Sequence, residues 1–519
     1  MSDKQQRRYP LKTASRMLPT DAFFWYAEAA APQVRPLVAG LFMLDRAPDR
    51  RRFRASVERL IAYVPRLQQR VVESPLPFAL PEWEDDHHFD LDYHLRTVVL
   101  PDPATDRQLF EFAGAVFATP LDHLRPLWEG YLIEGLSGGR AAYFLKLHHS
   151  VMDGAGAVAL FDAMTQARRT DVVKVPPRAR SRTSAPTMSA RVTTLLQQGA
   201  REAVTGIGGL ASSLVQSLLD PAATLNGWVR SAEKLGTMLG DMMSPPISDP
   251  LAARCTGIGR RLDGVSFSLA RLRAIKTALG ISLNDLALTS VAGAVARYHE
   301  HIGLFLDEVN CIVPMSLRED HERHALGNRV GAFTVRLPVG EPDPLARVER
   351  IHHQTRTAKG NRHGTAYQAL LQAIAIVPAF GFRALAQQAA GRVHLICSNV
   401  PGPTTHRYLG GARIEAVHPF APVMLGVPLS IAMVSYGESF AIGIDSDPAA
   451  IPDPERLTSY LTQEIDEIER RIAPSRRAPR PPRQRTAAAG APAPAAGARP
   501  NGRAGDPLPP DRPSPAELV

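Results

Sequence analysis

Hydrophobic residues in the first third of the chain mark a strand followed by a helix. The run 141–147 (AAYFLKL) is rich in apolar and aromatic residues, with imperfect alternation, and predicts a strand. Apolar positions then recur with helical spacing over 155–167, which predicts a helix. Two adjacent histidines, His148 and His149, lie between them. The pattern therefore places this pair at the end of a strand, just before a helix.

A second helix is predicted in the other half of the chain. Ser282 is a good N-cap candidate for a helix that runs to about residue 299. Asn284 and Asp285 then fall in its first turn, where exposed backbone N–H groups favour hydrogen-bond acceptors. The pattern predicts a buried apolar face for this helix, formed by Leu286, Leu288, Val291, Val295 and Tyr298.

Composition shifts divide the chain into four regions. Residues 1–173 mix strand-like and helix-like segments, as do residues 255–473. Between them, 174–254 begins with a Pro/Ser/Arg-rich linker and continues as a charge-poor helical crossover with one leucine stripe, Leu210, Leu214 and Leu218. The Pro/Ala/Arg-rich tail, 474–519, has too few bulky apolar residues to offset the entropy of ordering, so we expect it to be disordered.

Charge and composition narrow the class of protein. The chain has 519 residues and a net charge of +9, and the tail alone, with eight Arg and three acids, carries +5 of it. No nucleic-acid motif is present, so a solvated basic surface, or attraction to anionic lipid, is the expected meaning of the charge. Three scattered cysteines fit a reducing cytoplasm and form no zinc pattern. We find no signal peptide and no apolar run of transmembrane length, so we expect a soluble or peripheral protein.

One histidine in this setting could catalyse acyl transfer to an alcohol. The alcohol is a weak acid, so its proton must be removed as the oxygen attacks, and an imidazole near neutrality suits that role. A histidine pair alone is weak evidence, and His87-His88 elsewhere is assigned no role. The pair His148-His149 differs because Asp153 and Gly154 follow it at short spacing, so Asp153 could hold the loop and Gly154 could allow a sharp exit.

The segment from His148 to Gly154 reads HHxxxDG and resembles the signature of the chloramphenicol acetyltransferase-like superfamily. Pro126-Leu127-Trp128 resembles the PLW motif of the bacterial wax ester synthase/diacylglycerol acyltransferase family. Further segments resemble that family's motifs in the same order: Leu18-Pro19-Thr20-Asp21-Ala22-Phe23, Asn284-Asp285, Pro314-Met315-Ser316-Leu317-Arg318, Gly327-Asn328 with Gly331, and Ser398-Asn399-Val400-Pro401-Gly402-Pro403. The chain is identified as a member of this family.

The resemblance implies a fold and an activity. The expected fold class is α/β: two chloramphenicol acetyltransferase-like domains of mixed sheet flanked by helices, with an active-site tunnel between them and a disordered C-terminal tail. The expected reaction moves a long-chain acyl group from acyl-CoA to diacylglycerol or to a long-chain alcohol. His149 would be the general base, with His148 a packed neighbour and Asp153 structural. Acyl-CoA is a co-substrate, and no cofactor, metal or nucleic acid is implied.

Several roles stay open at this stage. The arginine that would pair with Asp153 is Arg66, Arg70 or Arg318. Trp128 is either a core aromatic or part of a substrate channel. Each of the following also has a structural and a functional interpretation: Pro126 and Leu127 before Trp128, Asn284 at the helix start, and Asn399 in its Pro/Gly loop.

Two rival functions also stay open. One is acyl transfer from a carrier-protein thioester, and the other is a weakly active lipid-binding paralogue. The expected location is the cytoplasm, peripheral on the inner face of the membrane or on lipid droplets. The sequence leaves the acceptor and the acyl chain length undetermined.

Overall fold

The computed structural model describes residues 15–31, 34–73, 80–176, 249–317, 328, 330–360, 392–423 and 426–472. The leucine stripe at 210–218, Arg318 and the tail lie outside these residues. The predicted elements around the histidine pair are present as a strand, β6 (Arg140–His148), and a helix, α6 (Gly154–Met164). The helix predicted after Ser282 is α11 (Leu283–His301), and Ser282 caps it.

The first of two mixed sheets carries β6 at an inner position. Its strand order is β11-β12-β1-β6-β5-β4, and only β4 and β5 run parallel. The other strands of this sheet are β1 (Leu37–Leu44), β4 (Leu95–Val99), β5 (Trp128–Leu136), β11 (Tyr408–Leu409) and β12 (Ala412–Phe420). A separate small sheet pairs β2 (Gln69–Val72) with β3 (Glu82–Asp85).

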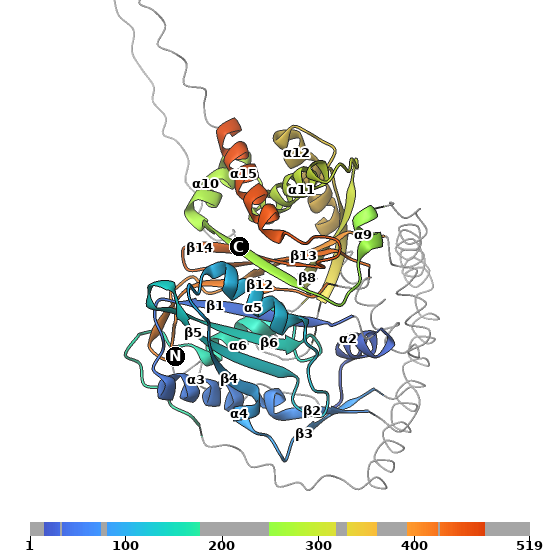
Figure 1. Ribbon diagram of the computed structural model, residues 1–519. Coiled ribbons are helices and arrows are strands. Elements are labelled where there is room, and N and C mark those ends of the chain that lie inside the picture. Colours follow the sequence, from blue (N-terminus) through green and yellow to red (C-terminus); the bar gives the residue numbers. More distant parts are fainter. Residues whose placement is uncertain are drawn as a thin grey trace, which may run out of the picture. The chain divides into compact units, whose positions relative to one another are not determined.

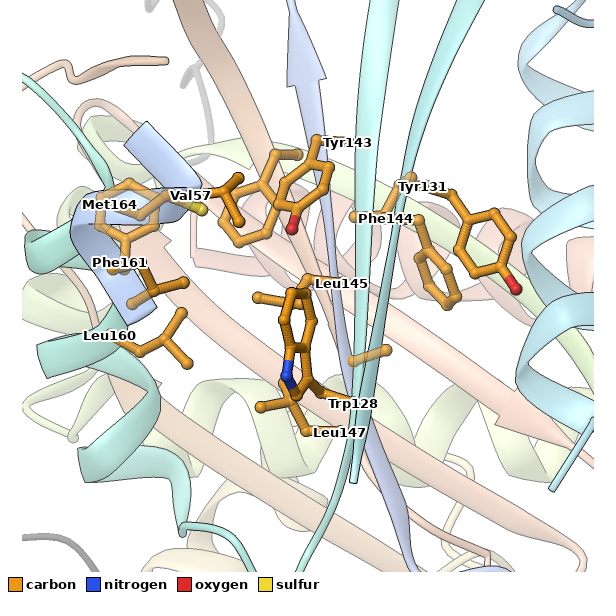
Figure 2. Close-up of a cluster of buried hydrophobic side chains, with 14 of the residues drawn as sticks. Val57, Trp128, Tyr131, Tyr143, Phe144, Leu145, Leu147, Leu160, Phe161 and Met164 are labelled. Atoms are coloured by element: carbon orange, nitrogen blue, oxygen red, sulfur yellow. The ribbon is translucent and has the colours of Figure 1, made fainter. Parts of the chain in front are cut away.

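Both faces of β6 are buried, which explains why its apolar residues alternate so poorly with polar ones. Tyr143, Leu145 and Leu147 point towards α6 and α3 (Arg50–Tyr63), whereas Phe144 points to the opposite face (Figure 2). On that opposite face the buried Lys146 ammonium donates to the end of α5 (Asp106–Ala118) and lies 2.8 Å from the Glu129 carboxylate. The strand therefore ends in a tightly packed environment that fixes where residue 148 lies.

The second sheet has the order β7-β14-β13-β10-β8-β9, with β10 parallel to both β13 and β8. Its strands are β7 (Arg261–Ser268), β8 (Val309–Ser316), β9 (Val330–Leu337), β10 (Leu395–Pro401), β13 (Leu429–Tyr436) and β14 (Ser439–Ser446). Four helices cover one of its faces (Figure 1): α10 (Leu269–Leu279), α11, α12 (Pro344–Gly360) and α15 (Pro454–Ile472). Shorter elements complete the described chain: α2 (Pro19–Ala30), α4 (Leu91–His94), α9 (Pro250–Arg254), η1 (Pro65–Gln68) and η2 (Ser137–Gly139).

The two sheets are interlocked by a strand from late in the sequence. β12 pairs with β1 of the first sheet, and Ala39 lies opposite Phe420. β12 also packs against β13 and β14 of the second sheet, while α5 contacts β7. Glycines allow this close approach, because a Cβ on Gly443 would overlap the Pro419 carbonyl and one on Gly264 would lie 2.5 Å from the His418 ring.

No single helix within the described ranges has both the length and the apolar composition needed to cross a membrane. The adjacent helices α10 and α11 meet those criteria only when they are taken together, and they are bent by 96° at the break between them.

We predict that Gly443→Ala destabilises the protein by about 1–3 kcal/mol, the usual effect of overpacking a filled interior. The added methyl group would displace the Pro419 backbone and so push the two sheets apart. Urea unfolding measures the change. Gly40→Ala in β1 is the control, because its Cβ would meet the side-chain ring of Phe42 at 3.1 Å and no backbone atom, and it should cost less. Equal stability of Gly443→Ala and the native chain would contradict this account of the interface.

Candidate active site

The backbone of His149 is held on both sides. Its N–H donates to the Pro36 carbonyl at 2.7 Å, which continues the pairing of β6 with β1 by one residue. Its carbonyl accepts from the Asn328 side-chain amide at 2.8 Å. Asn328 lies 179 residues later in the chain, so the two halves of the sequence meet at this residue.

The His149 ring is stacked, partly exposed and poorly solvated. It lies against Phe24 with ring centroids 3.9 Å apart and planes 16° from parallel. Burial lowers the pKa of His149 to about 4, and the opposing effects of its own carbonyl, Asp153 and Asn328 only partly offset this. The ring is therefore neutral at physiological pH, which is the form that can accept a proton.

His148 lies on the other side of the chain, where its ring is enclosed by Ser150 and Glu28. Nδ1 accepts from the Ser150 backbone N–H at 3.1 Å and lies 2.7 Å from the Ser150 hydroxyl. Because Nδ1 is an acceptor, the neutral ring carries its proton on Nε2, which is 3.2 Å from the Glu28 carboxylate but poorly aligned for a hydrogen bond. His148 is fully buried and its pKa is lowered by that burial. Because the His148 ring is fully buried, neither of its nitrogens is accessible to a substrate.

Glu28 stabilises this side of the site. Burial alone would raise the pKa of its carboxyl, but the interactions with His123 and His148 outweigh burial and hold that pKa at about 2. His123 Nε2 lies 2.9 Å from the same carboxylate, and the pKa of His123 is raised, chiefly by this contact. The ionised Glu28 thus fixes His148, and with it the strand end that presents His149.

Asp153 is the N-cap of α6, a role that was not predicted from the sequence. It is buried, and its carboxylate accepts from the Gly156 N–H at 2.9 Å. The adjoining Gly154 is needed for close packing, since a Cβ there would lie 2.7 Å from Val400. This contact brings HHxxxDG against the Ser398–Pro403 segment.

The arginine partner of Asp153 stays a prediction. Arg66 stacks on the Trp83 ring at 4.2 Å, and Arg70 lies 3.9 Å from Glu84. The third candidate, Arg318, lies outside the described residues.

The PLW segment belongs to the core of the first sheet. Trp128 lies in the buried cluster drawn in Figure 2 and is 1% exposed. It donates its indole N–H to the Leu67 carbonyl at 2.9 Å and stacks on His94. The Leu127 carbonyl accepts from the His148 N–H at 3.1 Å. Pro126 and Leu127 are buried beside it. The segment therefore supports the strand end that carries the histidines.

Asp285 stabilises the start of α11 in the second half of the chain. Its carboxylate completes a capping box with Ser282 and accepts from His352 at 2.9 Å and from Thr355 at 2.7 Å. Burial tends to raise its pKa, but these hydrogen bonds outweigh burial and lower it. The neighbouring Asn284 is partly exposed in the first turn of α11.

Asn399 lies on β10 opposite Met433 and is partly exposed. The chain after it makes a tight turn at Gly402, whose N–H donates to the Ser435 carbonyl at 3.0 Å. The structure thus places this segment beside the start of α6, through Val400.

Much of the site comes from α2 and Asn328, which the sequence did not indicate. Asp21, Phe24 and Glu28 of α2 contact Asn328, His149 and His148 respectively. Asp21 and Asn328 lay within matched motifs, but neither had a pattern that indicated a contact with the histidines. Within the described ranges, no three His, Cys, Asp or Glu side chains gather as metal ligands.

The fold of this chain is also found in a solved condensation domain. The starter condensation domain of rhizomide synthetase, solved in complex with C8-CoA, superimposes with a TM-score of 0.56 over 91% of this chain and 97% of that domain, at 15% identity. This likeness establishes the shared fold of two mixed sheets with flanking helices.

The chain belongs to the wax ester synthase/diacylglycerol acyltransferase family, and it is an acyltransferase. Residues 17–287 match the family's catalytic domain and residues 326–469 its C-terminal domain. A putative diacylglycerol O-acyltransferase of Mycobacterium tuberculosis is 30% identical, covering 85% of this chain and 89% of that protein. The solved wax ester synthase/diacylglycerol acyltransferase of Marinobacter aquaeolei is 25% identical, with a TM-score of 0.62, covering 88% of this chain and 99% of that one.

Proposed function

We propose that this enzyme transfers a long-chain acyl group from acyl-CoA to the hydroxyl of diacylglycerol, or of a long-chain alcohol, with His149 as general base. The observation that carries the proposal is the contrast within the histidine pair. His148 is fully buried, with Nδ1 bonded to Ser150 and Nε2 3.2 Å from the Glu28 carboxylate, whereas His149 is a neutral, partly exposed residue held firmly by its backbone. The substrates are those named for the family and its relatives.

The chemistry needs little more than this base. His149 takes the proton of the acceptor hydroxyl as its oxygen forms a bond to the thioester carbonyl. The carbon–sulfur bond then breaks, and the CoA sulfur leaves and takes the proton back from the imidazolium. The products are one ester and free CoA, so atoms and charge balance without a covalent enzyme intermediate.

The contact between Asn328 and His149 supports the proposal of a substrate tunnel between the N-terminal and C-terminal halves of the chain. It places His149 at their junction, where donor and acceptor could approach from different sides. In this arrangement Trp128 and Asp153 are supports of the base, and Asn284 and Asn399 are partly exposed polar groups.

A lipid surface is the natural place for such a reaction. Diacylglycerol and long-chain alcohols are too apolar to arrive through water at useful concentration. The enzyme would therefore bind a membrane or lipid droplet from the cytoplasmic side, with the basic tail 474–519 and the segment 190–245 as candidate contacts. A polybasic segment gains about 1 kcal/mol per Lys or Arg close to an anionic surface.

The activity is tested by measuring CoA release from palmitoyl-CoA with a panel of diacylglycerol and fatty alcohols. We predict that His149→Ala lowers kcat by on the order of 10²–10⁴, the usual effect of losing a general base. His148→Ala should be milder, and the exposed His87→Ala should match the native enzyme. Near-normal turnover by a folded His149→Ala protein would falsify the assignment. Turnover with a carrier-protein thioester but not with palmitoyl-CoA would show that the donor is wrong.

The pH dependence of kcat follows from the lowered pKa of His149. The base must be neutral, and with a pKa of about 4 it stays neutral from about pH 5 upwards. We therefore expect kcat to be flat through neutrality and to fall only as the pH falls towards 4. Tryptophan fluorescence at each pH checks that the protein remains folded. A half-maximal point near pH 6.5 in folded protein would mean that the base is better solvated than His149.

Deleting residues 474–519 should weaken membrane binding modestly and leave acyl transfer to soluble acceptors intact. The tail's contribution is electrostatic, so the loss of liposome co-sedimentation should be larger at low salt than at high salt. Vesicles that contain anionic lipid are compared with neutral ones. An inactive truncation would show that the tail is part of the folded enzyme, and unchanged binding at low salt would remove the tail from the membrane contact.

A further inference from the structure

The chain that follows α6 is held against the start of α3 at one corner of the fold. The Arg52 guanidinium, in the first turn of α3, donates to the backbone carbonyls of Arg169 and Asp171. Arg169 in turn donates to the Gly411 carbonyl at 2.9 Å and to the Asp45 carboxylate at 2.6 Å. These bonds fix the segment after α6 on the surface beside α3.

Basic side chains at this corner reach into solvent, whereas their acidic partners are mostly covered. The Arg46 side chain is 63% exposed and lies 3.5 Å from Asp45, which is 12% exposed. The Arg50 side chain is 68% exposed and lies 2.5 Å from Glu134, which is 14% exposed. Three more cations are exposed and form no ion pair within the described residues: Arg51, Arg168 and Lys174.

The other acids of the corner are bonded to backbone groups. The Asp49 carboxylate accepts from the Arg52 N–H, and the Asp171 carboxylate accepts from the Arg168 N–H, at 2.9 and 3.0 Å respectively. Neither forms an ion pair with an exposed cation of the corner. The surface therefore carries an excess of positive charge.

The stability of α3 does not explain these arginines. Arg50, Arg51 and Arg52 are its first three residues, and its first turn contains no acid. The N-terminal end of a helix carries partial positive charge, so cations there are unfavourable. Arg50 and Arg52 have partners in the fold, but Arg51 has none among the described residues. A residue that breaks a local rule without a structural return is expected at a functional surface.

Two valines are exposed beside the cations. Val172 is 80% exposed and Val175 is 40% exposed, with the exposed Lys174 between them. Cations interleaved with exposed apolar side chains fit the boundary of a bilayer, where phosphates lie next to acyl chains. A nucleic acid or another soluble polyanion would bind the cations but leave the valines in water. The combination therefore favours a lipid surface as the partner.

The sequence after Val172 adds positive charge and no negative charge. Residues 172–201 contain no Asp or Glu and six basic residues: Lys174, Arg178, Arg180, Arg182, Arg191 and Arg201. Residues 177–201 lie outside the described residues. A polybasic run of this kind is attracted to anionic lipid, and it leaves the described fold at the basic corner.

We propose that this corner binds the anionic phospholipid surface on which the enzyme meets its lipid substrates, through Arg50, Arg51, Arg168, Lys174, Val172 and Val175. The cations bind headgroup phosphates, and the valines enter the boundary with the acyl chains. The inference rests on the proposed function, which places the acceptor in lipid. It assigns the main membrane contact to the folded body, so the tail adds only a modest contribution.

Binding of the full-length enzyme to vesicles tests this surface. The probes are phosphatidylcholine vesicles with and without phosphatidylglycerol. The variant Arg51→Ser/Arg168→Ser/Lys174→Ser should bind anionic vesicles on the order of 100-fold more weakly, since each cation near such a surface contributes about fivefold. Its binding should also depend less on salt. Val172→Ser/Val175→Ser should weaken binding about tenfold at low and high salt alike, because apolar insertion is not screened.

The matched control removes the same number of charges from exposed positions in the second half of the chain. Arg273→Ser/Arg336→Ser/Arg356→Ser should bind anionic vesicles like the native enzyme. All three variants should keep the native Tm and the native rate of CoA release with a water-soluble acceptor, which shows that fold and chemistry are intact.

Four results would overturn the proposal. They are unchanged binding by the corner triple variant, an equal loss in the control triple variant, equal binding of the native enzyme to neutral vesicles, and a loss of heparin binding without a loss of vesicle binding. If vesicle binding behaves as expected but the native enzyme acylates no lipid acceptor, the membrane surface stands and the proposed function has failed.

Discussion

The site depends on how one residue's backbone is held. The His149 N–H is paired to Pro36 by the extension of β6 along β1, and its carbonyl is paired to the Asn328 amide. A catalytic group must be held within a fraction of an ångström to act efficiently, and hydrogen bonds to both peptide groups supply that restraint. The ring adds its own restraint by stacking on Phe24.

This restraint could not come from the first sheet alone. Asn328 lies two residues before Val330, the first residue of β9 in the second sheet, so its reach to His149 requires the two sheets to dock in one register. The pairing of β12 with β1 in the first sheet fixes that register. Gly264 and Gly443 allow the backbones of the two sheets to approach closely enough. Fold and site are thus coupled: packing at the interface decides where the amide meets the histidine.

The sequence predicted the local structure around the site better than its long-range contacts. β6, α6 and the cap of α11 followed from apolar spacing and capping residues, and the family and fold from the ordered motifs. The contact of Asn328 with His149 spans 179 residues and has no periodic signature, because it depends on sheet docking. The cap formed by Asp153 was missed because an Asp before two glycines also fits a loop ion pair.

Two adjacent histidines differ here because successive residues at a strand end face opposite surroundings. His148 points to Ser150, which bonds its Nδ1, and to the Glu28 carboxylate 3.2 Å from its Nε2, and it is fully buried between them. The His149 ring stacks on Phe24, its backbone carbonyl is held by Asn328, and burial lowers the pKa of the ring to about 4. A lower pKa weakens a base in principle, but it ensures that every molecule carries the neutral form at physiological pH. When the ring takes the acceptor's proton, nearby Asp153 and Asn328 stabilise the cation, since both raise its pKa. The same surroundings therefore keep the resting base neutral, and Asp153 and Asn328 offset only part of the cost of the charge that the reaction creates on the ring.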